Sequence, residues 1–209
     1  MPGAARRGPG RGAVRPDLAP PGAGIPALQR WVGRRLLLPW YCRRLTWEGV
    51  PDRLDAQGGL LLDSARGRSP EQMARRVLVP RQIGLEDSSR WHSAAMVLDH
   101  LAIVGARVAG IVHHLIRGAV PAGEVDTADL KPEPDIPFAE AARRYAAMLA
   151  GFRARTIEGG GDRSTPLRFL HPWFGPLSAF QWMCFAPFHQ EIHRRQMRRI
   201  VERLDQPGG

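Results

Sequence analysis

The chain has few cysteines, a single lysine and no long run of apolar residues. Its two cysteines, Cys42 and Cys184, lie far apart and match no CxxC pattern, which argues against a disulfide framework and a thiolate zinc site. No run of about 18 uncharged apolar residues occurs, so no membrane partner is expected. The arginine-containing N-terminus lacks the apolar stretch of a secretory signal. Together these absences favour a cytoplasmic protein.

Positive charge is abundant, but it comes almost entirely from arginine. The formal net charge is +10 over 209 residues, and of the 30 lysines and arginines only Lys131 is a lysine, which leaves 29 arginines. Because alanine, glycine and proline are also heavily used, coding from a GC-rich genome explains this bias more simply than a polyanionic partner does. A basic helical protein that binds nucleic acid without catalysis remains an alternative.

Hydrophobic periodicity predicts one helical domain preceded by a tail. Residues 1–26 are rich in Pro, Gly and Arg and are predicted to be disordered, and residues 27–205 form the domain. Its apolar residues recur at helical spacing, and caps and breakers mark the ends. The predicted helices are 27–45 (kinked or ended by Pro39), a short one after Ser69, 93–117, 138–156 and 178–204, with loops at 46–69, 118–137 and 158–175. No strand pair is predicted.

This pattern indicates an all-α fold with four main helices, most simply a four-helix bundle. Whether residues 27–68 complete the bundle or wrap around it stays open from the sequence.

Three histidines lie within the apolar stripes of two predicted helices. His189 and His193 are one turn apart, about 6 Å along the axis, and His100 lies on the inward stripe of residues 93–117. Buried imidazoles need partners. A hydrogen-bond network is one solution, and a three-histidine metal site with an open coordination position is the other. Because the three histidines occur together, the metal site is favoured over the hydrogen-bond network.

The remaining polar residues are placed by the same helical geometry. Asp99 and Glu191 lie off the inward stripes and are poor candidates for a base, whereas Gln196 is placed to hydrogen-bond a ligand. Of the other histidines, His92 is expected at the surface or at a cap, and His113 in solvent. His114 lies on the same stripe as His100 but too far along the helix to bind the same ion. His171, in the loop before the last helix, either lines the site or packs locally.

The residues around these histidines resemble the DinB-like metal-binding superfamily, which includes YfiT-type and thiol-dependent enzymes. The segments 98–102 (LDHLA) and 189–196 (HQEIHRRQ) resemble its two ligand segments, and 171–178 (HPWFGPLS), followed by Trp182, resembles the approach to the second. The chain departs from the pattern in two places. A Trp-Ser opening appears as Trp91-His92-Ser93, and Pro187 is expected to kink the last helix.

The resemblance implies a four-helix bundle that holds a divalent ion (zinc, nickel or iron) on His100, His189 and His193, with Gln196, His171 and Trp182 around it. It further implies a small-molecule substrate, a low-molecular-weight thiol as possible cosubstrate, and a homodimer. Thiol-dependent S-transfer and metal-assisted hydrolysis both remain open. The rival interpretations are the nucleic-acid binder and a structural bundle that binds a protein partner, with its histidines merely packed.

Overall fold

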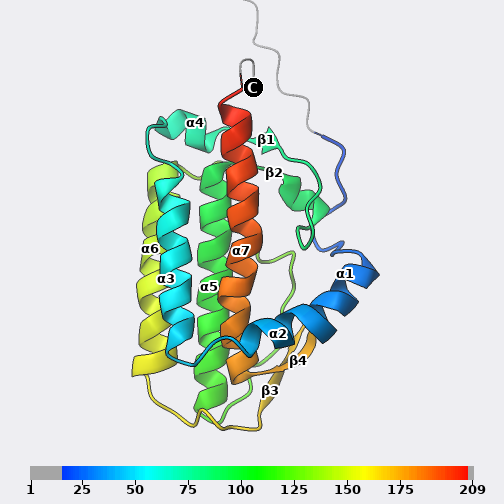
Figure 1. Ribbon diagram of the computed structural model, residues 1–209, viewed down its shortest axis with the longest axis vertical. Helices are drawn as coiled ribbons and strands as arrows, with labels where there is room; N and C mark the ends of the chain where they lie inside the picture. Colours follow the sequence, from blue (N-terminus) through cyan, green and yellow to red (C-terminus); the bar gives the residue numbers. More distant parts are fainter. Residues whose placement is uncertain (1–15, 207–209) are drawn as a thin grey trace, which may run out of the picture.

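Four long helices lie side by side in the computed structural model, which describes residues 16–206 (Figure 1). They are α3 (Gly49–Asp63), α5 (Ala94–Ile116), α6 (Phe138–Arg153) and α7 (Ala179–Leu204). A π-helical stretch, η3 (Ala154–Glu158), extends α6. The prediction of an all-α four-helix bundle is confirmed.

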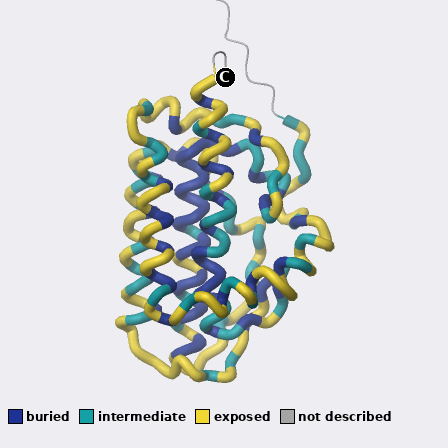
Figure 2. The backbone as a smooth tube through the Cα atoms, viewed as in Figure 1, coloured by how far each residue is buried: buried dark blue, intermediate teal, exposed yellow. Residues whose placement is uncertain are grey.

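Helices α5 and α7 carry most of the core, as their long buried stretches show (Figure 2). Ser93 caps α5 by accepting a hydrogen bond from the Met96 amide, and Ser178 forms a capping box with Gln181 at the start of α7. Helix α7 continues through Pro187 without ending. Helix α5 is long and apolar enough to cross a membrane, but 78% of its most apolar window is buried inside the protein, as expected of a core helix.

The predicted loop at 46–69 is wrong, because α3 occupies most of it and completes the bundle. Pro51 lies in the first turn, where no intrahelical partner is needed for the backbone nitrogen. Gly58 lies where α3 meets α6, and a Cβ there would be 2.8 Å from Leu149 Cδ1. The residues that suggest a loop in the sequence thus mark a helix start and a close helix contact.

The predicted helix at 27–45 exists but is not a bundle helix. It consists of α1 (Ala27–Val32), the π-helical η1 (Gly33–Leu37) and α2 (Leu38–Cys42), with Pro39 just after the π-helical stretch. It crosses obliquely beside the bundle (Figure 1). Residues 27–68 therefore do both things that the sequence left open: 27–42 wraps around the bundle and 49–63 completes it.

Part of the predicted N-terminal tail is anchored. Residues 1–15 lie outside the described residues. Residues 16–26 form no helix or strand, but the amides of Ala19 and Gly24 donate hydrogen bonds to Asp87 and Glu86 at 3.0 and 2.9 Å. This stretch is therefore held against the domain and differs from a free tail.

Two small antiparallel ribbons correct the prediction that no strands pair. β1 (Val77–Leu78) pairs with β2 (Trp91–His92), and β3 (Arg168–His171) pairs with β4 (Gly175–Ser178). The short helices α4 (Pro70–Ala74) and η2 (Asp87–Arg90) complete the connection between α3 and α5. Strands of two to four residues are too short to give a readable alternation.

Candidate metal centre

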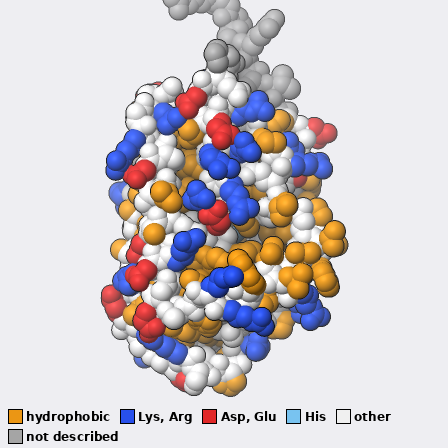
Figure 3. Space-filling view, viewed as in Figure 1, with side chains coloured by type: hydrophobic (Ala, Val, Ile, Leu, Met, Phe, Trp, Pro, Cys, Tyr) orange, Lys and Arg blue, Asp and Glu red, His pale blue; other side chains and the backbone are white. Residues whose placement is uncertain are grey.

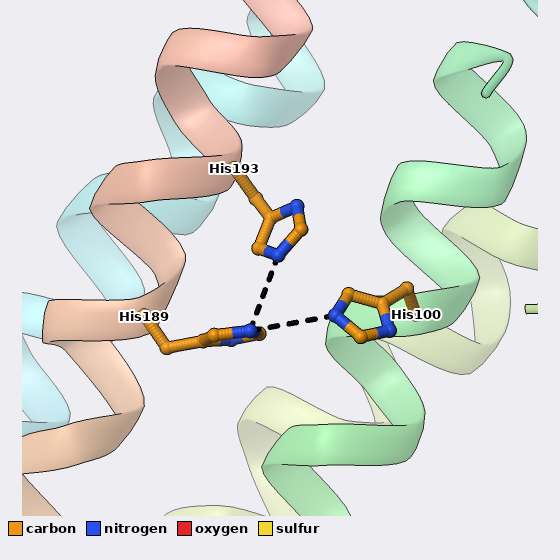
Figure 4. Close-up of side chains that lie close together, drawn as sticks. All are labelled: His100, His189 and His193. Carbon is orange, nitrogen blue, oxygen red and sulfur yellow. Dashed lines mark hydrogen bonds between the residues drawn. The ribbon is translucent and has the colours of Figure 1, made fainter. Parts of the chain in front are cut away.

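Helices α5 and α7 bring three imidazoles together in the bundle. His100 extends from α5, and His189 and His193 extend from α7 toward it (Figure 4). The Nε2 atom of His189 lies 3.1 Å from Nε2 of His193 and 3.4 Å from Nε2 of His100. His100 and His193 are buried, and His189 is half-buried. The spacing of these residues in the sequence therefore becomes one cluster of nitrogens.

Hydrogen bonds on the far side of two rings fix their tautomers. Nδ1 of His100 donates to the Leu130 carbonyl at 2.7 Å, and Nδ1 of His193 donates to Oε1 of Gln196 at 2.6 Å. The Gln196 amide donates in turn to the Ser89 carbonyl at 2.6 Å, so its oxygen is the atom left for His193. Both neutral rings therefore present an unprotonated Nε2 to the centre of the cluster.

The donor set fits a divalent metal ion. Two lone pairs face His189, whose Nε2 proton can satisfy only one of them. Tetrahedral ligands at zinc–nitrogen distances of about 2.0–2.1 Å lie about 3.3 Å apart, close to the 3.1 and 3.4 Å between these nitrogens. A buried group of three histidines could therefore hold a metal ion.

Burial keeps these imidazoles neutral. Loss of hydration lowers the pKa of His100 to about 4, and it lowers the pKa values of His189 and His193 well below their usual range. At neutral pH the three rings thus retain the lone pairs that metal ligation requires.

Two of the predicted neighbours line the cavity in front of the cluster. The cavity is about 60 Å³ in volume, and its wall includes His171 and Trp182 as well as the three histidines. His171 lies on β3, packs against Trp182 and Phe185, and accepts hydrogen bonds from the Trp173 and Phe174 amides. It therefore both lines the cavity and packs locally, but it lies outside the group of three nitrogens.

The residues that sequence reasoning set aside have structural roles, with one correction. The buried Asp99 accepts from the Glu133 amide and pairs with Arg144, and Glu191 pairs with Arg194 and Arg195. His92 was expected at the surface or at a cap but is 4% exposed, and β2 carries it beside residues 16–21. His113 and His114 bond carbonyl groups at the far end of α5.

The sequence did not reveal the residues that support the cluster from outside the two helices. The carbonyl groups of Leu130 and Ser89 orient the site, and a backbone carbonyl has no sequence signature. Next to Leu130, the Lys131 ammonium bonds Glu86 and Ser88 within the connections that precede α5 and α6. Among these residues only Lys131 could have been singled out from the sequence, because it is the single lysine of the chain.

Comparison with known proteins supports the fold. No family model and no curated protein matches this chain. Among solved structures, the chain is similar to one described as "TT2238, a four-helix bundle protein", with a TM-score of 0.52 and 23% identity, over 73% of this chain and 98% of that one. This likeness establishes the class of fold, a four-helix bundle, and leaves function to the site.

Proposed function

We propose that the protein is a divalent-metal-dependent enzyme of the DinB-like kind, with His100, His189 and His193 as the metal ligands. The observation that carries the proposal is the convergence of three Nε2 atoms, two of which have their tautomers fixed by hydrogen bonds at Nδ1. If the histidines were needed only for packing, their lone pairs would have no reason to converge on one point.

The surrounding residues support a catalytic site rather than a closed structural one. Three protein ligands leave a coordination position open, and the cavity in front of them has room for water-sized groups. The Leu130 carbonyl and Gln196 hold His100 and His193 in position, and His171 and Trp182 form part of the cavity wall.

When bound, a zinc, nickel or iron ion supplies Lewis-acid chemistry, which eases deprotonation of a water or a thiol. Thiol-dependent S-transfer is the reaction that the DinB-like resemblance favours, and hydrolysis is the alternative. Neither Asp99 nor Glu191 is free to act as the base, because both carboxylates are held by arginines. The thiols of Cys42 and Cys184 are buried next to each other, and a reducing compartment such as the cytoplasm, which we propose, would keep them reduced.

The test is the metal content per chain, measured by mass spectrometry on untagged protein. We expect about one equivalent in the wild type, and its loss in His100→Ala and His193→Ala. His114→Ala is the matched control, since this histidine bonds only a carbonyl group of its own helix. Absence of metal after reconstitution with zinc, nickel and iron would overturn the proposal.

The nucleic-acid alternative has less support. The arginine face of α7 is linked by ion pairs, with Glu191 holding Arg194 and Arg195, and Glu202 holding Arg198 and Arg199. These ion pairs neutralise part of the positive charge that would attract a phosphate backbone.

A further inference from the structure

A second cavity adjoins the metal centre and differs from the first in character. It lies between the N-terminal helical segment and α7, and its volume is about 270 Å³. Its wall is mostly apolar and aromatic and includes Leu37, Trp40, Tyr41, Phe174 and Phe188. We call it the apolar chamber. The cavity of about 60 Å³ in front of the three histidines is called the polar chamber because the imidazoles, Glu86, Arg107 and Lys131 line it, although much of its wall is apolar as well.

The two chambers share part of their walls. Gly84, Trp173, Phe185 and His189 line both of them. His189 is therefore a ligand candidate on one side and a wall of the apolar chamber on the other. The shared residues place the two chambers side by side, so a ligand that occupied both would pass beside His189.

The apolar chamber opens at the surface. Leu37, Trp40 and Ile83 on its wall are 43%, 54% and 72% exposed, and hydrophobic side chains gather on this face of the molecule (Figure 3). A contiguous patch of exposed apolar side chains around a cavity is typical of a site that binds an apolar group. The polar groups on this wall are few: the Gln29 side-chain oxygen accepts from the Gly84 amide, Glu191 is paired with Arg195, and the Tyr41 hydroxyl is buried with no hydrogen-bond partner among the described residues.

The charges around the polar chamber select the sign of the group that binds there. Three neutral imidazoles leave the double positive charge of a divalent ion uncompensated. Glu86, the acid on this wall, is paired with Lys131. Arg107 also lines the chamber, and no ion pair joins it to an acidic side chain within residues 16–206. The balance is positive, so an anionic group is favoured.

We infer that the substrate is a two-part molecule, with an anionic head in the polar chamber and a hydrocarbon tail in the apolar chamber. This inference rests on the proposed function for the head and on the aromatic wall for the tail. The N-terminal segment 27–42 thereby acquires a role, since it supplies the outer wall of the tail site and lies outside the bundle itself.

The test uses straight-chain carboxylates, from acetate through butanoate and hexanoate to octanoate, titrated by calorimetry into zinc-loaded protein. We expect the affinity to rise about fourfold per methylene, the change that burial of one methylene produces. Octylamine, with the same tail and a cationic head, should bind at least tenfold more weakly than octanoate. Equal affinities for acetate and octanoate, or for octanoate and octylamine, would overturn the inference.

Neighbouring leucines provide a matched pair of variants. Leu37→Glu places a charge on the wall of the apolar chamber and should abolish the gain with chain length. Leu36→Glu changes an adjacent, more exposed residue outside that wall and should retain the gain. Both positions are at the surface, so both variants should fold. An equal effect of the two changes would contradict the placement of the tail.

The same titration without metal separates this inference from the proposed function. The tail site is built from side chains alone, so the gain with chain length should persist in metal-free protein at lower overall affinity. A chain that takes no metal but shows this gain would refute the metal centre and keep the apolar chamber. A chain that binds metal but shows no gain with chain length would refute the tail site and keep the metal centre.

Discussion

The Oε1 atom of Gln196 lies 2.6 Å from Nδ1 of His193, one turn earlier on the same helix. Gln196 is fully buried, and its amide nitrogen is held by the Ser89 carbonyl. This chain of two hydrogen bonds ties the tautomer of a ligand candidate to the segment that precedes α5. At the proposed metal centre the glutamine would therefore act through His193 and not as a ligand.

Replacing this glutamine tests that relationship. Gln196→Met keeps the approximate size of the side chain and removes both hydrogen bonds. Zinc affinity should fall about 10- to 100-fold, the usual effect of losing a partner that orients a histidine ligand. Competition with a chelator measures the change.

The control for this variant is Gln190→Met on the same helix. Gln190 is also buried, and it bonds the Tyr145 hydroxyl and the Leu54 carbonyl at 2.7 and 2.8 Å. Its loss should lower the free energy of unfolding while zinc affinity stays within about twofold. If both variants lose zinc equally, the role of Gln196 is general stability rather than orientation of His193.

The sequence predicted the helices that carry long apolar stripes. It missed elements whose positions depend on contacts with other parts of the fold. Helices α5 and α7 have clear periodicity and serine caps, and both were placed to within a residue or two. Helix α3 was missed because its Gly58 serves a close contact with α6, which only the packed structure reveals. Local signals cannot distinguish a glycine that ends a helix from one that admits a neighbour.

The residues of the candidate site were likewise predictable where local sequence places them and were missed where tertiary structure does. Helical spacing alone placed His100, His189 and His193 on inward faces, and the structure brings them together. The partners of the rings could be predicted only where a side chain supplies them, as Gln196 does. The Leu130 carbonyl belongs to a long connection without periodicity, so its place beside His100 depends on tertiary structure.

Acid should destabilise the metal-free protein through its buried histidines. Burial lowers the pKa of both His92 and His171 to about 3, whereas a histidine in the unfolded chain has a pKa of about 6.5. Between these values the unfolded chain binds protons that the native state does not, so the free energy of unfolding falls as the pH falls. The loss is up to about 1.4 kcal/mol per pH unit for each histidine, and it vanishes above about pH 6.5.

Urea denaturation at pH 7.5, 6.0 and 5.0 measures this loss, in a range where most carboxylates are still ionised. His171→Asn removes one of the titrating groups and should reduce the slope between pH 6.0 and 5.0. His114→Asn, at an exposed position on α5, should leave the slope unchanged. A urea midpoint independent of pH across this range would show that the histidines are not buried as described.

The single lysine should be important for stability. The Lys131 ammonium is bonded to Glu86, whose side chain is 5% exposed. Glu86 also accepts from the Gly24 amide at 2.9 Å, so it joins the N-terminal segment to the connection before α6. Lys131→Met leaves this carboxylate buried without its cation and should cost about 3 kcal/mol of unfolding free energy, as breaking buried pairs does.

A double variant separates the charge from the packing. Glu86→Gln combined with Lys131→Met removes both charges, and it should recover part of the loss because no buried ion is left unpaired. Arg66→Met breaks a pair with Asp63 whose side chains are 82% and 53% exposed, and it should change stability by less than about 1 kcal/mol. Urea midpoints for the four proteins give the comparison. A Lys131→Met variant as stable as Arg66→Met would mean that water, rather than the ammonium, solvates Glu86, and the anchoring of residues 16–26 would then need another explanation.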